Sequence, residues 1–421
     1  MKYRAIKGTR DLLPREMAAR RYIEETARDL FERYGYAPIA TPVFEQTELF
    51  VRGIGEDSDI VRKEMYTFTD RKGRSLTLRP EGTAPVVRAY IENNLSEWRN
   101  PTKLYYYLPM YRYERPQKGR MREFYQVGVE LLGAPGPDAD AEVIALFLEY
   151  LTALGLSGFE CRINTIGCRS CRKPYLETLR TYLLENESAL CPDCRDRART
   201  NPMRAFDCKV EACQAVLADA PRVTDYVCES CAAHFEGVKA HLTALDIPFV
   251  VDRRLVRGFD YYEKTTFEVV SPYLGAQSAL GGGGRYDPLV RDCGGPDTPG
   301  LGFAIGVERL LLQLEEEKVA LPREHAIDAF VCFVGDDLAT EAFRVVMELR
   351  KSGIASDMDY AHRSLKAQLK LASKAGARVA VFVAPDELAA GSLKIRNMVT
   401  GDERLVEHGA LVEEVRALTR A

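Results

Sequence analysis

The sequence predicts an α+β protein that ends in a separate α/β unit, and three patterns carry this prediction. Up to about residue 320, strand patterns such as 104–111 and 124–132 are accompanied by amphipathic helices. Between about residues 168 and 245 the pattern becomes helical, charged and rich in cysteine, which indicates an insertion. Beyond residue 329, strand and helix patterns alternate, as they do in a small parallel sheet covered by helices.

The N-terminal part begins with a predicted helix over 15–34, which Gly35 ends. Its apolar face is formed by Ile23, Ala27, Leu30, Phe31 and Tyr34. The elements expected next are an extended segment over 37–44, a strand over 76–80, a helix over 84–93 and a helix over 140–154. Helices beside strands in this order favour an α+β domain.

The segment 111–133, YRYERPQKGRMREFYQVGVELLG, is predicted to be a long hairpin loop followed by the second strand of the hairpin, residues 124–132. Five cations lie in this loop: Arg112, Arg115, Lys118, Arg120 and Arg122. Guanidinium groups keep their charge and bind phosphate oxygens in pairs, so the loop indicates a phosphate site. A solvated charged turn is the alternative for the loop taken alone.

Two further segments combine polar and aromatic or glycine residues. The segment 257–262, RGFDYY, is predicted to form a polar pocket wall, or alternatively a strand end with core tyrosines. The glycine run 281–284 leads into Arg285, Tyr286 and Asp287 and lacks the spacing of a dinucleotide-binding loop. We expect a tight hairpin there, where backbone approaches a ligand. A strand over 265–270 and a helix over 307–317 complete this part.

The domain boundary is expected near Pro322, because strand and helix patterns begin to alternate after it. Residues 1–325 would form the first domain, with the insertion at about 168–245, and residues 326–421 the second. In the second domain the order strand, helix, strand, helix, strand over 329–383 predicts a parallel α/β sheet.

Composition restricts the class of protein. The 421 residues allow two or three domains, and 46% hydrophobic and 29% charged residues are typical of a globular chain. A net charge of −4 argues against a general nucleic-acid coat but permits local basic surfaces. We expect no signal peptide and no membrane span, and therefore a cytoplasmic location.

Eleven cysteines without a secretion signal favour reduced thiols over a disulfide framework. Eight of them form close pairs inside the insertion: Cys168 and Cys171, Cys191 and Cys194, Cys208 and Cys213, Cys228 and Cys231. Thiols two residues apart suit tetrahedral zinc, so a structural Zn²⁺ on Cys191, Cys194, Cys228 and Cys231 is one hypothesis. Buried free thiols are the other, and the metal question stays open at this point.

Six segments together resemble class II aminoacyl-tRNA synthetases, and among these the histidyl-tRNA synthetase family of the bacterial kind. The six segments are residues 8–14, the region of Pro42, residues 111–130, 257–262, 282–287 and 302–309. The resemblance covers essentially the whole chain, with Phe259 as a departure where leucine is common. It implies a catalytic domain with a six-stranded antiparallel sheet flanked by helices, and an anticodon-binding domain at the C-terminus.

The resemblance also implies a reaction. L-Histidine would be activated with ATP and Mg²⁺ to histidyl-adenylate, and the acyl group would pass to the 3′ end of tRNA(His). Pro42, in the segment like the first family motif, implies a homodimer. Basic residues Arg363, Lys366 and Lys370 would meet tRNA phosphates. The closest alternative is a non-catalytic relative, the regulatory subunit of ATP phosphoribosyltransferase, which typically lacks the C-terminal domain.

Site residues follow from the matched motifs. Arg257, Arg112 and Glu81 are implied to be catalytic, with Glu81 also a candidate for proton removal. The residues implied to bind histidine are Glu81, Thr83, Arg112, Gln126, Glu130, Arg257, Tyr261, Tyr262 and Tyr286. The residues implied to bind ATP are Arg112, Arg120, Phe124 and Arg309. A pocket that pairs with both imidazole nitrogens would reject analogues lacking them.

Overall fold

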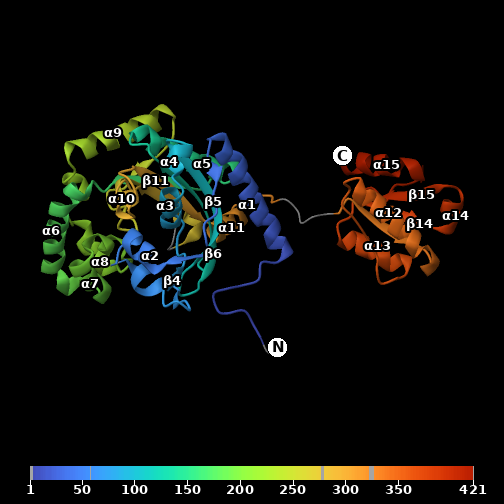
Figure 1. The fold of residues 1–421 in the computed structure, drawn as a ribbon, viewed down its shortest axis with the longest axis horizontal. Coiled ribbons are helices and arrows are strands. Elements are labelled where there is room, and N and C mark those ends of the chain that lie inside the picture. The colour runs from blue at the N-terminus through green and yellow to red at the C-terminus, as the bar shows by residue number, and fades with distance from the viewer. Residues whose placement is uncertain (1–2, 57, 276–278, 322–326, 421) are drawn as a thin grey trace. The chain divides into compact units, whose positions relative to one another are not determined.

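The computed structural model describes residues 3–56, 58–275, 279–321 and 327–420. The chain divides into two compact units, residues 1–321 and 322–421 (Figure 1). The boundary expected between residues 325 and 326, and the linker expected at Pro322, lie outside the described residues.

An eight-stranded sheet organises the first unit. Its strands follow one another in the spatial order β1 (Ala37–Pro38), β5 (Thr102–Tyr111), β6 (Glu123–Leu132), β11 (Gly300–Gly306), β10 (Ala279–Arg285), β9 (Glu263–Val270), β7 (Glu160–Thr165) and β8 (Val250–Val251). The six strands from β5 to β7 in this order pair antiparallel, and the short edge strands β1 and β8 pair parallel to their neighbours. The prediction of a six-stranded antiparallel sheet is therefore confirmed.

Helices α1 (Pro14–Arg33), α5 (Pro137–Ala153) and α11 (Val307–Glu316) bury their apolar faces in the core of this sheet, and the short helix η5 (Pro272–Leu274) lies against α11. Phe147 of α5 stacks on Phe303 of β11 with 4.8 Å between ring centroids, and Phe31 of α1 meets Phe303 edge-on at 6.0 Å. All three rings are at most 2% exposed. Burying one such ring contributes roughly 1.5–3 kcal/mol, so this aromatic contact fixes both helices on the sheet.

A small three-stranded sheet lies beside the large one in the first unit, in the order β2 (Phe44–Gln46), β4 (Ser75–Leu78), β3 (Thr67–Thr69). Strand β4 leads through Glu81 into helix α3, as the sequence predicts. The helices of this region are α2 (Thr47–Ile54), η1 (Ile60–Glu64), α3 (Thr83–Glu92), α4 (Leu95–Trp98) and α10 (Leu289–Asp292).

The insertion is helical, which confirms the prediction for this segment. Figure 1 shows α6, α7 and α8 grouped at one end of the first unit. Helix α9 packs back on α5 of the sheet layer. Its elements are α6 (Arg169–Glu185), η2 (Glu187–Ala189), α7 (Pro192–Thr200), η3 (Pro202–Asp207), α8 (Glu211–Ala218), η4 (Val223–Asp225) and α9 (Glu229–Ala244).

The glycine run 281–284 forms the middle of β10, so the expected tight hairpin was wrong. A side chain at Gly283 would place its Cβ 1.9 Å from the carbonyl oxygen of Gly302 on the neighbouring strand. At Gly282 it would lie 2.9 Å from a guanidinium nitrogen of Arg257. Because these glycines have no side chains, the neighbouring strands and the Arg257 side chain can approach β10 closely. A glycine run in the sequence is compatible both with this role in a strand and with a hairpin, and the strand is what the structure shows.

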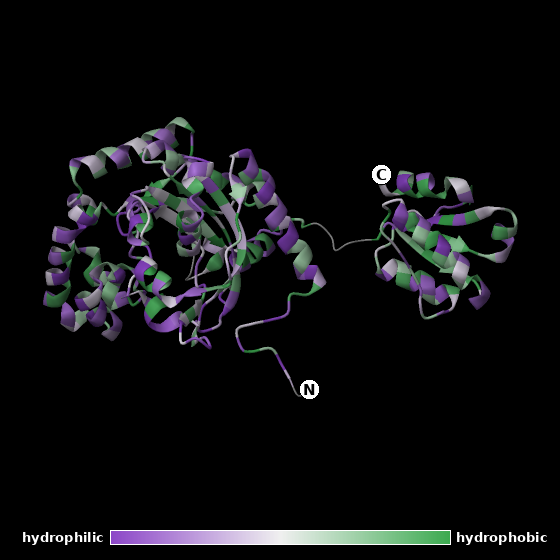
Figure 2. Cartoon of the chain, viewed as in Figure 1, coloured by the Kyte–Doolittle hydropathy of each residue, from purple (hydrophilic) through white to green (hydrophobic). Residues whose placement is uncertain are grey.

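The second unit has a five-stranded sheet in the order β13, β12, β14, β15, β16. β13, β12 and β14 are parallel, as predicted, whereas β15 and β16 add an antiparallel pair that the sequence analysis did not identify. Figure 2 shows the central strands as hydrophobic between helices of mixed character. The strands are β12 (Ala329–Phe333), β13 (Ser356–Met358), β14 (Val379–Val383), β15 (Ser392–Asn397) and β16 (Glu403–Glu407). The helices are η6 (Asp336–Leu338), α12 (Ala339–Lys351), α13 (Leu365–Lys374), α14 (Pro385–Ala389), η7 (His408–Ala410) and α15 (Leu411–Arg420).

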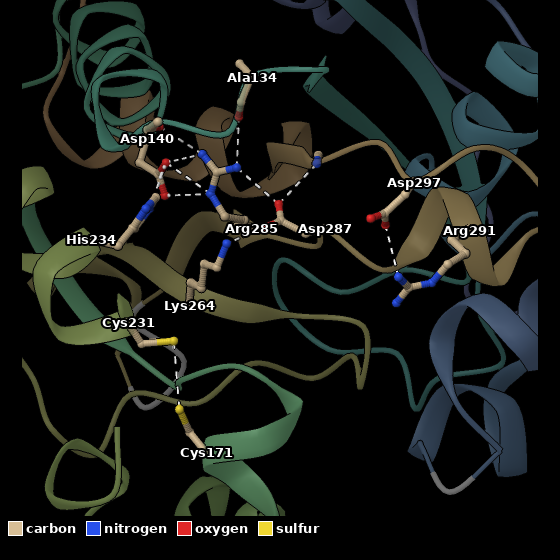
Figure 3. A network of polar contacts seen from close by, with 12 residues as sticks. Ala134, Asp140, Cys171, Cys231, His234, Lys264, Arg285, Asp287, Arg291 and Asp297 are labelled. Carbon is tan, nitrogen blue, oxygen red and sulfur yellow. Dashed lines mark hydrogen bonds and ion pairs between the residues drawn. The ribbon is translucent and has the colours of Figure 1, made fainter. Parts of the chain in front are cut away.

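A buried ion pair joins the end of β10 to α5 (Figure 3). The side chains of Arg285 and Asp140 are both 0% exposed. Arg285 also pairs with Asp287 at 3.1 Å and donates to the carbonyl oxygen of Ala134 at 2.9 Å. Burial alone would raise the pKa of Asp140, but the adjacent His234 and the charge of Arg285 outweigh burial and lower this pKa. The pair thus fixes β10, α5 and, through His234, α9.

Arg285→Met is expected to lower the free energy of unfolding by about 3–5 kcal/mol, because it leaves the Asp140 carboxylate buried without its cation. Arg291→Met is the matched control, since its pair with Asp297 at 3.0 Å is 54% and 77% exposed and such pairs contribute little. Thermal unfolding measures both variants. Equal, small shifts for both would contradict the role given to Arg285.

Candidate active site

A cavity of about 650 Å³ opens in the first unit, and most of the predicted site residues line it. They come from segments far apart in the sequence: the start of α3 with the residues before it, the loop between β5 and β6, strand β6 itself, the segment before β9, and α11. The fold therefore brings together Glu81, Thr83, Arg112, Arg120, Phe124, Gln126, Arg257, Tyr261, Tyr262 and Arg309. Glu130 and Tyr286 are not part of this lining.

Two of the five cations of the β5–β6 loop line the cavity, Arg112 and Arg120. Arg112 donates from Nε to the carbonyl oxygen of Pro80 at 2.8 Å, and its guanidinium lies 5.3 Å from the ring centroid of Phe124. Arg120 lies 3.3 Å from Glu114, which also lies 3.7 Å from Arg112. Glu114, which the sequence analysis did not select, thus holds both guanidinium groups at the cavity.

The other loop cations lie elsewhere. Lys118 pairs with Glu316 of α11 at 3.3 Å, and the guanidinium of Arg122 lies 4.0 Å from the ring centroid of Tyr113. Arg115 is exposed. The alternative of a solvated charged turn therefore describes Arg115, Lys118 and Arg122. The interpretation as a phosphate site fits the other two cations, Arg112 and Arg120.

Arg309, in the first turn of α11, lines the same cavity as the two loop arginines. It donates to the carbonyl oxygen of Ala279. Burial, followed by the charges of Arg120 and Arg112, lowers the pKa of Arg309 to about 10. Like charges held together in a partly buried cavity repel one another, and a bound polyanion would remove that repulsion. The electrostatics of this end of the cavity therefore fit a polyphosphate.

Arg257 occupies the other part of the cavity. Its Nη1 lies 2.7 Å from the carboxylate of Glu268 on β9. Its Nε is buried and has no hydrogen-bond partner within the described part of the chain. A buried guanidinium with one donor free is suited to bind a further anionic group. The insertion adds four charged residues to the same lining that sequence reasoning missed: Arg197, Arg204, Asp207 and Lys209.

Glu81 caps the start of α3. Its carboxylate accepts the backbone N–H of Thr83 at 2.6 Å and of Ala84 at 2.8 Å. Burial raises the pKa of Glu81, although these two hydrogen bonds oppose the increase. Glu81 is thus a buried carboxylate at the cavity wall, oriented by a helix N-terminus.

Glu130 lies behind the wall rather than on it, and is 1% exposed. It accepts hydrogen bonds from the hydroxyls of Thr83 at 2.8 Å, Tyr106 at 3.3 Å and Tyr286. Burial raises the pKa of Glu130 to about 8. Because Thr83 and Tyr106 line the cavity, Glu130 and Tyr286 position lining residues. Tyr106 had not been selected from the sequence.

Gln126, Tyr261 and Tyr262 complete the wall. The side-chain oxygen of Gln126 is buried and has no hydrogen-bond partner among the residues that the structure describes. Both tyrosines are 5% exposed, with ring centroids 4.7 Å apart. The two interpretations of RGFDYY are therefore compatible, because Tyr261 and Tyr262 belong to the core and also line the cavity.

The cysteines of the insertion pair differently from the zinc hypothesis. Cys191 and Cys194 lie with Cys208 and Cys213, whereas Cys228 and Cys231 lie with Cys168 and Cys171. The proposed set of Cys191, Cys194, Cys228 and Cys231 was therefore wrong. Spacing identifies the close pairs, but the path of the helices between them decides which pairs meet.

Known families match both units. The family model described as Histidyl-tRNA synthetase matches residues 8–168 and 186–310, and the one described as Anticodon binding domain matches residues 328–418. A histidine–tRNA ligase of Caldanaerobacter subterraneus subsp. tengcongensis is 48% identical over 412 residues, 98% of each chain. One of Pelotomaculum thermopropionicum is 49% identical over 410 residues, 97% of this chain and 96% of the relative.

Solved structures agree with the sequence comparisons. The apo histidyl-tRNA synthetase of S. aureus superimposes with a TM-score of 0.83 at 39% identity, covering 98% of this chain and all of that chain. The large sheet flanked by helices and the separate α/β unit are those of a class II aminoacyl-tRNA synthetase. Within that class, the chain belongs to the histidyl-tRNA synthetase family. No helix within the described ranges is long and apolar enough to cross a membrane.

The raised pKa of Glu130 gives a pH prediction. A carboxyl whose pKa rises from 4.5 to about 8 on folding stabilises the fold at low pH. That stability falls by about 1.4 kcal/mol per pH unit as the pH rises toward the folded-state value. Glu130→Gln keeps an uncharged group, so between about pH 5 and pH 8 the variant should gain thermal stability relative to the parent.

Melting temperatures at several pH values without substrates measure this effect. Glu97→Gln on the exposed surface is the matched control and should follow the parent. Parallel pH profiles for Glu130→Gln and the parent would show that Glu130 is not protonated in the folded protein.

Proposed function

We propose that this chain activates L-histidine with ATP and transfers the histidyl group to the 3′ end of tRNA(His), as a histidine–tRNA ligase. The observation that carries the proposal is one cavity that is lined both by the arginines Arg112, Arg120 and Arg309 and by a buried polar wall. Relatives of nearly the same length that bear this name support it.

ATP would bind at the arginine-rich end. Arg120 and Arg309 would take the outer phosphates, and Arg112 the α-phosphate. Phe124, 5.3 Å from the Arg112 guanidinium, would offer its ring to adenine. Since Arg112 is already fixed by Pro80 and Glu114, little reorganisation would accompany binding, which favours phosphoryl transfer by positioning.

In the first step a carboxylate oxygen of histidine would attack the α-phosphorus, and the bond to the departing pyrophosphate would break. Arg257 would stabilise the charge that develops there through its free Nε. In the second step a ribose hydroxyl of tRNA would attack the histidyl carbonyl, and AMP would leave. Glu81, with its raised pKa, is the candidate acceptor for the hydroxyl proton.

Magnesium would accompany the ATP phosphates and neutralise part of their charge. Two carboxylates that line the cavity fit this role, Glu64 and Glu114. Burial and then the charge of Glu114 raise the pKa of Glu64. A cation held by these two oxygen donors would relieve their repulsion.

Histidine would be recognised by the polar wall. The unpaired oxygen of Gln126 suits an N–H donor of the substrate, and the carboxylate of Glu81 suits its ammonium group. Tyr261 and Tyr262 would pack against the imidazole. Thr83 would be held for this task by its hydrogen bond to Glu130 at 2.8 Å. Arg112 and Arg257 would bind the substrate carboxylate.

Partners follow from the surface of each unit. Pro42 is exposed and is followed by Val43, 39% exposed, and Phe44, 51% exposed. An apolar run of this kind on a monomer favours a subunit interface, and we assign it to the homodimer. Lys366 and Lys370 are exposed on one face of α13 and would meet tRNA phosphates. We place the enzyme in the cytoplasm.

The regulatory-subunit alternative is disfavoured by the match of residues 328–418 to an anticodon-binding domain and by the retained cavity arginines. A charging assay decides between them. With ATP, magnesium, labelled histidine and a tRNA(His) transcript, acid-precipitable label should accumulate on that transcript and not on a control tRNA. No label on either transcript would favour the regulatory protein.

Arg257→Ala should lower kcat for histidine activation about a hundred- to thousandfold, because a donor aimed at the developing charge is lost. The KM for histidine should change far less. Arg254→Ala, on the exposed side of the same segment, is the control and should keep the parental kcat. Initial rates of histidine-dependent pyrophosphate exchange measure both, and an unchanged kcat in Arg257→Ala would remove this arginine from the reaction.

A further inference from the structure

The eight paired cysteines of the insertion form two separate clusters. In each cluster the four sulfur atoms lie within 4.8 Å of one another. The first cluster is Cys168, Cys171, Cys228 and Cys231, and the second is Cys191, Cys194, Cys208 and Cys213. All eight are free thiols.

The first cluster joins the beginning of the insertion to its last helix. Cys168 is the N-cap of α6 and Cys228 the N-cap of α9, with Cys171 and Cys231 in the first turn of each helix. The Sγ atoms of Cys168 and Cys171 are 3.4 Å apart, and those of Cys171 and Cys231 are 3.8 Å apart (Figure 3). The backbone N–H of Cys228 donates to Cys171 Sγ at 3.0 Å.

The second cluster has a similar design. Cys191 is the N-cap of α7, and Cys194 lies in its first turn. Cys191 Sγ lies 3.8 Å from Cys208 Sγ, and the backbone N–H of Cys191 donates to Cys213 Sγ at 3.2 Å. Cys208 also accepts the N–H of Val210 at 3.5 Å. Four thiols from three helical segments thus converge on one point.

We propose that each cluster binds one Zn²⁺ through four cysteine thiolates. Zinc–sulfur bonds of about 2.3 Å in a tetrahedron place the sulfur atoms ~3.8 Å apart, and the separations of 3.4 and 3.8 Å lie at or near this value. A disulfide would require about 2.05 Å instead. Helix N-termini and backbone N–H groups directed at sulfur favour the thiolate form that a metal needs.

The clusters lie where the insertion needs support. Without metal, four thiols would face one another in each cluster, within a segment of charged helices. The first site would fasten α6 to α9, and α9 carries His234 onto Asp140. The second site would fix Cys208, whose neighbours Asp207 and Lys209 line the cavity. Zinc would therefore set both ends of the insertion against the catalytic sheet and its site.

Metal analysis of the full chain tests the proposal. Protein prepared in reducing buffer without added zinc should contain two zinc ions per chain by mass spectrometry. Cys168→Ser with Cys171→Ser should retain one, and Cys191→Ser with Cys194→Ser should also retain one. Cys293→Ser, which changes a half-buried cysteine outside both clusters, should retain two.

A second measurement on the unaltered chain does not depend on how the variants fold. After removal of metal and anaerobic addition of Co²⁺, the absorption spectrum should be that of tetrahedral cobalt thiolate and should saturate at two equivalents. Absence of metal after anaerobic addition of zinc, with all eight thiols open to a thiol reagent, would overturn the proposal. Iron in place of zinc, or a single ion per chain, would overturn it as well.

Discussion

The geometry of the site depends on the buried ion pair between Arg285 and Asp140. Neither side chain reaches solvent, so each charge requires the other to remain in the core. The residue after Arg285 is Tyr286, whose hydroxyl binds Glu130, and Glu130 in turn binds Thr83 at the cavity wall. Fixing the end of β10 therefore fixes a chain of contacts that ends where substrate would bind.

The clustered arginines of the cavity lower the stability of the folded protein, because like charges repel one another. Arg112, Arg120 and Arg309 line the same cavity, and the charges of the first two contribute to the lowered pKa of Arg309. Three contacts hold these charges in place. Glu114 pairs with Arg120, and the backbone carbonyl groups of Pro80 and Ala279 accept hydrogen bonds from Arg112 and Arg309. A bound polyphosphate would complete the neutralisation of these charges.

The sequence predicts much of this fold because the spacing of apolar residues along each segment agrees with the face that the segment buries in the folded protein. The hairpin strands, the helix over 140–154 and the order of elements over 329–383 follow from apolar periodicity. Periodicity does not distinguish a glycine-rich central strand from a hairpin, which explains the error at 281–284. It also does not show that Glu130 lies behind Thr83, or which cysteine pairs meet, because these depend on contacts between distant segments.

Pyrophosphate–ATP exchange with each of the twenty amino acids measures whether this cavity activates histidine. Exchange with histidine alone is expected, because the polar wall of Glu81, Thr83 and Gln126 would pair with its nitrogen atoms. Exchange with a different amino acid would contradict the assigned specificity. No exchange with any amino acid would contradict the roles given to Arg112, Arg257 and Arg309.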